Sequence, residues 1–182
     1  MSRPYRFLAF DLGAESGRAV LGVLEANQLS LEVVHRFRTE GLTMLGVRQW
    51  DVARIYEELC EGLAQCVRLH GPDLDGIGVD TWGVDFGLLD SQGFLLSNPL
   101  SYRNAIGEGE LSTLSESERR WMFEKTGIQN NKINTLYQLA GIKRQMPEIF
   151  GIAKRKKWIW LLIIPIFIHM LLHIVTFGIE RY

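Results

Sequence analysis

Runs of apolar residues mark three strands at the start of the chain. Residues 7–12 form a short apolar run that ends in Asp11-Leu12-Gly13, a pattern typical of a buried strand that enters a tight turn. Residues 18–24 alternate between two faces, and residues 29–37 follow after Asn27, which stands where a hairpin turn would be. The chain is therefore expected to open with an antiparallel meander.

A helical repeat follows the meander. Asp51 is a suitable N-cap and Gly71 is a suitable stop for a helix between them. Apolar residues recur every four positions in this stretch and give the helix one face to bury, namely Ile55, Leu59, Leu63 and Val67.

Short strands and turns come next. Residues 77–81 are predicted to form a short apolar strand. Residues 86–89 and 94–96 flank Asp90-Ser91-Gln92-Gly93, which is a good turn sequence, so a second hairpin is expected there.

Two further helices are signalled by their ends. Ser115 and Glu118 make a capping box for a helix that should stop at Gly127. Residues 134–145 are predicted to form another helix, which Pro147 ends. The order of strands and helices predicts a mixed α/β domain.

Composition and charge narrow the class of protein. With 182 residues, 47% of them hydrophobic, the chain can bury one good core, so one globular domain with an appendage is expected. The net charge of -1 leaves no basic excess to neutralise phosphates, which argues against a nucleic-acid partner. Cys60 and Cys66 are interpreted as reduced thiols, and the N-terminus lacks the apolar run of a signal peptide, so a cytoplasmic protein is predicted.

The end of the chain breaks with this composition. From Trp158 to Ile179 there is no Asp, Glu, Lys or Arg, and the basic run Lys154-Arg155-Lys156-Lys157 precedes this span. We therefore divide the chain into a globular domain at 1–155 and an apolar tail at 156–182. The tail is long enough for a helix that attaches the chain to a membrane. The other interpretation, which stays open, is a core segment disturbed by a change of reading frame.

The first group of candidate site residues lies at the turn after the first strand. Glycines there let backbone N–H groups approach an anion, a serine hydroxyl adds a donor, and an arginine can offset phosphate charge. A carboxylate at the strand end could hold Mg²⁺ through water. The absence of a following Gly-Lys-Ser/Thr means that this is not a P-loop, and a purely structural hairpin remains the alternative. The group comprises Asp11, Gly13, Ala14, Glu15, Ser16, Gly17 and Arg18.

The second group interrupts the apolar strand near residue 80. Polar residues gather around a glycine at the end of that strand, and ligand sites of α/β sheets lie at such ends. Aspartates accept hydrogen bonds from sugar hydroxyls, and a glycine lets a small ligand reach the backbone. The alternative is a tight turn with solvated aspartates. The group comprises Asp80, Thr81, Trp82, Gly83 and Asp85.

A family resemblance joins these blocks. The runs 7–22 and 77–90, then Pro99-Leu100-Ser101-Tyr102-Arg103, Gly127-Ile128-Gln129 and the run 134–139 resemble, in this order, the N-terminal domain of the rhamnulokinases of the FGGY carbohydrate kinases. The first run is shared by the whole actin-like superfamily. The run Asp80-Thr81-Trp82-Gly83-Val84-Asp85-Phe86 is far more discriminating within it.

The resemblance implies a ribonuclease H-like fold with a mixed sheet, to which the apolar tail would add a C-terminal helix. It implies that ATP and Mg²⁺ bind between two such domains and that the γ-phosphate passes to the 1-hydroxyl of L-rhamnulose or a similar ketose. Residues 13–18 would lie along the phosphates and Asp11 near the metal. Residues 80–83, Asp85 and Arg103 would face the sugar.

Two departures from the family pattern limit what this chain should do. Asn104 follows Arg103 where the family usually has Asp, which removes a charge near the expected sugar site. The proton acceptor of the family is an aspartate of the C-terminal kinase domain, and no matching motif occurs here, so we expect the chain to be inactive alone. The alternative function is a non-catalytic fragment, membrane-attached or sugar-binding.

Overall fold

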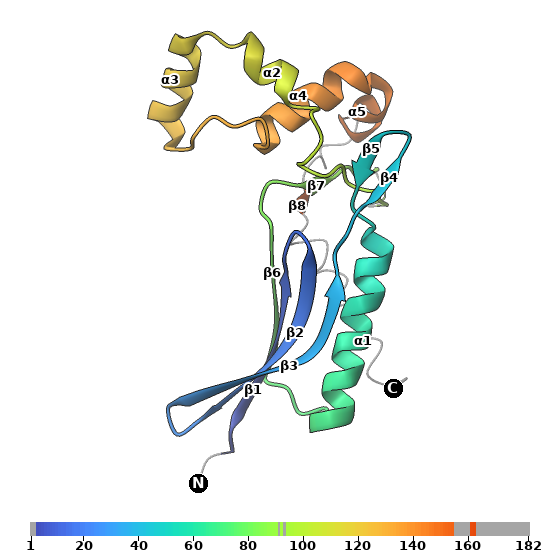
Figure 1. Ribbon diagram of the computed structural model, residues 1–182, viewed down its shortest axis with the longest axis vertical. Helices are drawn as coiled ribbons and strands as arrows, with labels where there is room; N and C mark the ends of the chain where they lie inside the picture. The colour runs from blue at the N-terminus through green and yellow to red at the C-terminus, as the bar shows by residue number, and fades with distance from the viewer. Residues whose placement is uncertain (1–2, 91, 93, 155–160, 163–182) are drawn as a thin grey trace. The chain divides into compact units, whose positions relative to one another are not determined.

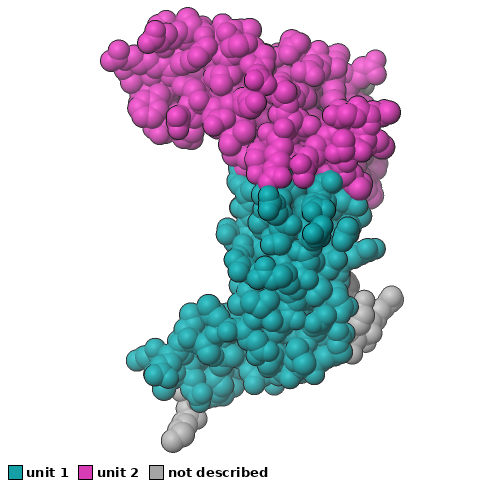
Figure 2. Space-filling model, in the orientation of Figure 1, with its two compact units in different colours: residues 1–41, 50–83, 163–182 teal, residues 42–49, 84–162 magenta. Residues whose placement is uncertain are grey.

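The computed structural model describes residues 3–90, 92, 94–154 and 161–162. The described chain divides into two compact units, coloured separately in Figure 2. Unit 1 comprises residues 3–41 and 50–83, and unit 2 comprises residues 42–49 together with the described residues from 84 to 162. Each unit is described by itself.

Unit 1 is built on a four-stranded mixed sheet (Figure 1). Its strands are β1 (Tyr5–Leu12), β2 (Ser16–Glu25), β3 (Gln28–Arg38) and β6 (Gly76–Thr81), in the order β3-β2-β1-β6. The first three strands are antiparallel, as the apolar pattern predicts, and β6 lies parallel to β1. At the β2–β3 turn, Ala26 and Asn27 both have positive φ, a conformation that Asn tolerates better than most residues.

Helix α1 (Val52–His70) covers one face of this sheet. It begins at Asp51, whose carboxylate accepts a bond from the Arg54 N–H, and it ends at Gly71, as predicted. Its buried residues meet alternate residues of the strands, because strand side chains point to opposite faces in turn. The unit 1 core contains Leu8, Phe10, Leu12, Ala19, Leu21, Val34, Phe37, Trp50, Val52, Ile55, Leu59, Leu63 and Cys66.

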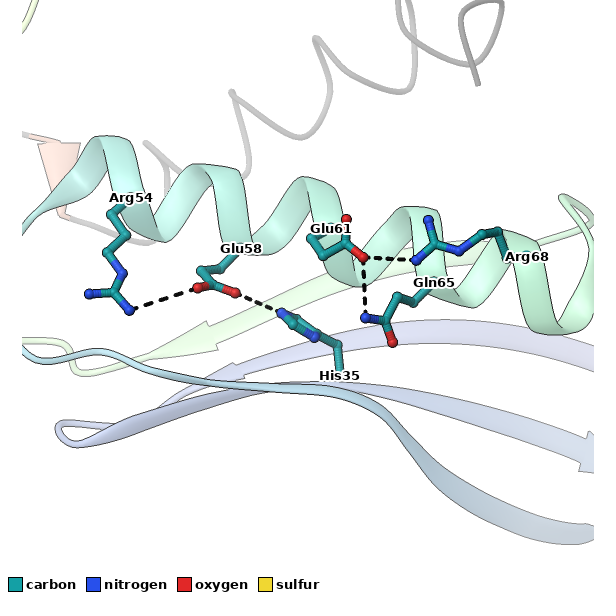
Figure 3. A network of polar contacts seen from close by, with 6 residues as sticks. All are labelled: His35, Arg54, Glu58, Glu61, Gln65 and Arg68. Atoms are coloured by element: carbon teal, nitrogen blue, oxygen red, sulfur yellow. Dashed lines mark hydrogen bonds and ion pairs between the residues drawn. The ribbon is translucent and has the colours of Figure 1, made fainter.

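Two clusters of polar side chains lie along α1 (Figure 3). In one, the His35 ring of β3 lies 2.7 Å from the Glu58 carboxylate, and Arg54 lies 4.0 Å from the other oxygen of Glu58. In the other, Glu61 accepts bonds from Gln65 and Arg68, and the Arg68 bond is the main reason that the pKa of Glu61 is lowered. The His35–Glu58 contact therefore adds a polar link between sheet and helix at the edge of the core.

Unit 2 consists of short elements. They are the hairpin of β4 (Leu42–Met44) and β5 (Val47–Gln49), the strand pair of β7 (Phe86–Gly87) and β8 (Leu161–Leu162), and the helices α2 (Glu108–Thr113), α3 (Glu116–Thr126), α4 (Thr135–Gln145) and α5 (Pro147–Lys154). Its core gathers Phe86, Leu88, Ile106, Leu139, Ile142 and Ala153. The predicted capping box at the start of α3 is present, with Ser115 and Glu118 bonding each other's backbone, and Gly127 ends the helix with φ of 68°.

Several elements of unit 2 differ from the sequence prediction. The β4–β5 hairpin and α2 are not signalled by their short, irregular apolar patterns. The second predicted hairpin is present but short: Leu89 and Leu95 form an antiparallel bridge, and backbone bonds join Asp90 to Phe94 and Leu96 to Leu88. Residues 86–87, predicted as part of this hairpin, form β7 and pair with β8. Pro147 does end the preceding helix but also begins α5, since proline suits the first turn of a helix.

Most of the predicted apolar helix at 158–179 lies outside the described residues. Its two described residues, Leu161 and Leu162, form strand β8 rather than a helix. No helix within the described ranges is long and apolar enough to cross a bilayer.

Candidate functional site

Three strand ends meet at one edge of the unit 1 sheet. Leu12, the last residue of β1, pairs with Gly17 on one side and with Thr81 on the other. One step earlier, Asp11 stands between Arg18 of β2 and Asp80 of β6. The two groups that the sequence singles out, the glycine turn (residues 11–18) and the β6 end (residues 80–83), thus lie at the same sheet edge, separated by one strand.

The glycine turn is closed by its own backbone. The Gly13 N–H donates to the Ser16 carbonyl at 3.0 Å, and a Cβ on Gly13 would lie 3.0 Å from that same oxygen. Gly17 has a different reason to be glycine. A Cβ there would lie 2.4 Å from the ring of Phe37, so its small size serves packing inside the sheet.

The charged residues of the turn face each other. The Nε and Nη2 atoms of Arg18 each lie 2.7 Å from Oδ2 of Asp11, across the β1–β2 pair, and both side chains are partly exposed. Exposed ion pairs of this kind contribute about 0–1 kcal/mol. An anion that approaches Arg18, or a hydrated cation that approaches Asp11, therefore competes with a weak bond.

Thr39, which the sequence pattern does not single out, fastens the turn from β3. Its N–H donates to the Glu15 carbonyl at 3.2 Å, and its hydroxyl donates to the Gly13 carbonyl at 2.5 Å. The residue is 1% exposed. Gly13 lies 26 positions before Thr39 in the sequence, so no local sequence pattern could reveal this contact.

A cavity of about 490 Å³ opens beside the turn, within the size range of small-molecule sites. The Arg38 guanidinium and the Glu40 carboxylate are paired there at 3.0 Å. The cavity has both acidic and basic side chains in its lining. The lining residues are Glu15, Ser16, Arg36, Phe37, Arg38 and Glu40.

The β6 end exposes some groups and buries others. Asp80 and Gly83 are exposed, whereas Thr81 and Trp82 are half-buried. The Trp82 ring packs against the fully buried Trp50 ring, with centroids 4.2 Å apart. Within the described part of the chain, the buried Thr81 Oγ1 and Trp82 Nε1 atoms have no hydrogen-bond partner, an arrangement that costs about 1–3 kcal/mol per group.

The remaining predicted sugar residues, Asp85 and Arg103, belong to unit 2. Asp85 is completely buried, and Oδ1 of its carboxylate accepts a bond from Gln138 Nε2 at 3.3 Å. The preceding carbonyl, that of Val84, accepts bonds from Thr135 Oγ1 at 2.8 Å and from Gln138 Nε2 at 3.0 Å. Helix α4 thus fixes the chain that follows the β6 end.

Arg103 is exposed, and its guanidinium carbon lies 5.8 Å from the centre of the Tyr102 ring. Its neighbour Asn104 has a clear structural role. The Asn104 side-chain amide donates to the carbonyls of Arg48 and Ser101 and accepts from the Arg48 N–H. An aspartate could accept but not donate, so asparagine suits this position better than the usual family residue.

Among the residues that the structure describes, no group of three or more His, Cys, Asp or Glu is placed to hold a metal ion. Asp11, the residue predicted to hold Mg²⁺ through water, is a single carboxylate near the end of β1. Mg²⁺ commonly keeps several waters and takes one or two carboxylates.

Comparisons with known proteins agree on one family. The model of the N-terminal domain of the FGGY family of carbohydrate kinases matches residues 6–176. A rhamnulokinase of Oceanobacillus iheyensis is 36% identical over 166 residues, which cover 91% of this chain and 34% of the relative. A rhamnulokinase of Halalkalibacterium halodurans is 38% identical over 167 residues, with the same coverage. The chain therefore spans about a third of the length of the curated relatives it matches.

Solved structures show the same fold. A ligand-bound xylulose kinase of Lactobacillus acidophilus superimposes with a TM-score of 0.71 at 16% identity, covering 82% of this chain and 30% of that one. A xylulose kinase of Rhodospirillum rubrum gives a TM-score of 0.64 at 21% identity, covering 81% and 30%. At these identities the likeness concerns the fold alone, and it confirms the predicted α/β architecture with a mixed sheet.

Proposed function

The chain belongs to the FGGY family of carbohydrate kinases, and from that premise we propose that it carries the phosphate- and sugar-facing residues of a rhamnulokinase. The observation that supports this most is the register of one strand. Asp11 of β1 stands between Arg18 and Asp80, so a group suited to phosphate and a group suited to sugar hydroxyls lie on either side of one carboxylate. The rhamnulokinase relatives support the choice of sugar.

The proposed reaction is transfer of the γ-phosphoryl group of ATP to the 1-hydroxyl of L-rhamnulose. The hydroxyl oxygen forms a bond to the γ-phosphorus as the bond to the bridging oxygen of ADP breaks, and the hydroxyl proton passes to a base. We assign that base to no residue among these 182. The products are ADP and L-rhamnulose 1-phosphate, and the consumption of ATP suits a cytoplasmic setting.

The residues of the glycine turn fit a nucleotide bound with Mg²⁺. Residues 13–17 would lie along the phosphates. The Ala14 and Ser16 N–H groups and the Ser16 hydroxyl would donate to phosphate oxygens, and the Arg18 guanidinium would offset their charge. Asp11 would hold Mg²⁺ through water, which would release its present partner, Arg18, to the phosphates. When bound, the metal would neutralise charge on the phosphates and help to align them.

The residues of the β6 end fit a ketose. Asp80 is exposed and accepts hydrogen bonds, and Gly83 has open space where a Cβ would lie, so a ligand can approach the backbone there. Thr81 and Trp82 each hold a buried polar atom without a partner in the described chain, which a hydroxyl-rich ligand could satisfy after a small movement of the turn. Asp85 and Arg103, which belong to unit 2, are included in the proposal by the family resemblance alone.

The test compares this chain with a fusion. We would assay L-rhamnulose-dependent ADP formation by the 182-residue chain and by the same chain joined to the remaining two thirds of the Oceanobacillus iheyensis rhamnulokinase. The fusion should turn over, and the short chain should not. Arg18→Ala in the fusion should raise the KM for ATP, and Asp80→Asn should raise the KM for the ketose.

Three results would contradict the proposal. Turnover by the short chain would show that it holds its own base. A fusion that prefers xylulose or glycerol would refute the choice of sugar. A fusion with no sugar kinase activity, when the intact Oceanobacillus iheyensis enzyme is active beside it, would favour a non-catalytic sugar-binding module.

A further inference from the structure

The glycine turn is held from one side by a single buried residue. Thr39 follows β3 directly and makes two hydrogen bonds to the turn, one from its N–H to the Glu15 carbonyl and one from its hydroxyl to the Gly13 carbonyl. No other hydroxyl is recorded on either carbonyl in the described chain. The residue is 1% exposed, so water cannot readily replace its side chain.

These two bonds determine where the turn's donors point. In a planar trans peptide unit, the carbonyl and the following N–H point in opposite directions. Fixing the Gly13 carbonyl toward Thr39 therefore directs the Ala14 N–H away from Thr39. Likewise, the bond that holds the Glu15 carbonyl toward Thr39 directs the Ser16 N–H away from Thr39. Both N–H groups belong to the set that an anion at this turn would require.

Packing supports the same arrangement. Phe37, two residues before Thr39 on the buried face of β3, lies against the space where a Cβ of Gly17 would be. The end of β3 therefore supports the glycine turn twice, with a ring under Gly17 and a hydroxyl on Gly13. Of these two side-chain contacts, only that of the Thr39 hydroxyl affects the direction of a peptide group.

We propose that Thr39 is a positioning residue for phosphate binding, acting through the Gly13 and Glu15 carbonyls to aim the Ala14 and Ser16 N–H groups at the anion. The inference rests on the proposed function, because it takes a nucleotide phosphate chain as the anion. Thr39 itself touches no phosphate. Its hydroxyl orients the turn before the ligand arrives.

The experiment uses two variants of the 182-residue chain. Thr39→Val keeps the shape and the backbone N–H but removes the hydroxyl, and Thr39→Ser keeps the hydroxyl. Inorganic tripolyphosphate, titrated calorimetrically, is the probe. We expect Thr39→Val to weaken binding about tenfold, the effect of one hydrogen bond to a buried acceptor, and Thr39→Ser to bind within about twofold of the parent chain.

A second readout does not depend on any ligand. Amide hydrogen exchange at Ala14 should be faster in Thr39→Val than in the parent chain and in Thr39→Ser. Exchange at Ser16, where the Thr39 N–H still holds the Glu15 carbonyl, and in the middle of β1 should stay unchanged. A purely structural role would instead raise exchange throughout the sheet and weaken L-rhamnulose binding to the same degree as tripolyphosphate binding.

The two readouts separate the two claims. If the parent chain binds no tripolyphosphate, the proposed function fails for this chain, and the exchange rates alone then decide the role of Thr39. If Thr39→Val exchanges like the parent at Ala14, or binds tripolyphosphate equally well, the positioning role is wrong.

Discussion

The glycine turn in unit 1 and the segment around Val84 in unit 2 are held by different kinds of interaction. In unit 1, β1 pairs along its whole length with β2 and along most of it with β6, and α1 covers one face of this sheet with apolar side chains. In unit 2, the Val84 carbonyl is held by the side chains of Thr135 and Gln138. The Arg48 backbone is likewise held by the side chain of Asn104.

This difference decides which substitutions matter in each unit. A backbone ladder forms with almost any side chain, so unit 1 should depend on apolar volume in its core. Unit 2 has a smaller core and uses amide side chains to satisfy backbone groups. Removing one of these amides takes a donor away from part-buried backbone groups, which costs about 0.5–1.5 kcal/mol for each bond lost. Substitutions of core residues in unit 1 and of polar side chains in unit 2 should therefore differ in their cost.

The largest effect should come from the unit 1 core. Leu59 of α1 is 0% exposed, so Leu59→Ala removes buried methyl groups and leaves a cavity. We expect a loss of about 2–5 kcal/mol in the free energy of unfolding, measured by urea denaturation with exchange of β1 amides as the local probe. The matched control is Leu69→Ala on the same helix, where the side chain is 63% exposed and the loss should be below about 0.5 kcal/mol. Equal losses of unfolding free energy for Leu59→Ala and Leu69→Ala would contradict the dependence of unit 1 on buried apolar volume.

The next effect should come from Gln138 in unit 2. Its Nε2 atom donates to the Val84 and Ile133 carbonyls and to Asp85, and the residue is 2% exposed. Gln138→Leu should cost about 2–3 kcal/mol, because three hydrogen bonds are lost, one of them to the buried Asp85 carboxylate, while the side-chain volume is kept. Exchange of α4 amides measures the loss. Gln145→Leu, at the exposed end of the same helix, should change little. A neutral Gln138→Leu would show that volume, not hydrogen bonding, dominates here too.

Asn104 tests the same idea with a smaller change. Asn104→Asp restores the residue usual in the family, keeps the acceptor for the Arg48 N–H and removes both donated bonds. We expect a loss of about 1–2 kcal/mol in unfolding free energy. Asn131→Asp is the control, since Asn131 is recorded only as an acceptor, from the Ile133 N–H. If Asn104→Asp proves more stable than the parent, our account of this departure from the family is wrong.

The smallest effect concerns the capping box of α3 and its dependence on pH. The Glu118 carboxylate accepts bonds from the Ser115 hydroxyl and N–H, which lowers its pKa below the ordinary value of 4.5. Its charge therefore stabilises the helix above about pH 4.5, and this contribution is lost as the pH falls through the lower pKa of the folded state. Glu118→Gln should lower the Tm slightly at pH 7.

The capping prediction is checked by repeating the melts at lower pH. The difference in Tm between the parent and Glu118→Gln should shrink as the pH drops below 4.5. Glu116→Gln, in the same first turn but outside the box, should show a smaller difference at pH 7. A gap that widens at acid pH would have the wrong sign for this mechanism.

Features that depend on residues close together in the sequence could be predicted, whereas features that depend on distant residues could not. The β1–β2–β3 meander, the Asp51 cap of α1 and the Ser115–Glu118 box are each encoded within a few neighbouring residues, and the structure has them all. The pairing of β7 with β8 and the small hairpin β4–β5 were not predicted, because their strands are too short to carry a periodic pattern.

The residues of the candidate site also fall into a predicted group and a group that was not predicted. The glycine turn and the β6 end were predicted as strand ends, and the parallel register of β1 and β6 brings them to one edge. Thr39 and Gln138 were missed, because their contacts join residues 26 and 54 positions apart and neither residue type stands out locally. The packing of Gly17 against Phe37 was not predicted either, because the two residues lie on different strands, and the contact of Gly17 with phosphate stays a prediction.

The central claim is that a phosphate site and a sugar site lie at one edge of the unit 1 sheet, on either side of Asp11. Backbone amide NMR of the isotope-labelled chain tests it directly, with tripolyphosphate and L-rhamnulose titrated separately. The account predicts that tripolyphosphate shifts residues 13–18 and that L-rhamnulose shifts residues 80–83, with Asp11 responding to both. Shifts confined to other parts of unit 1, or the same set of residues responding to both ligands, would contradict it.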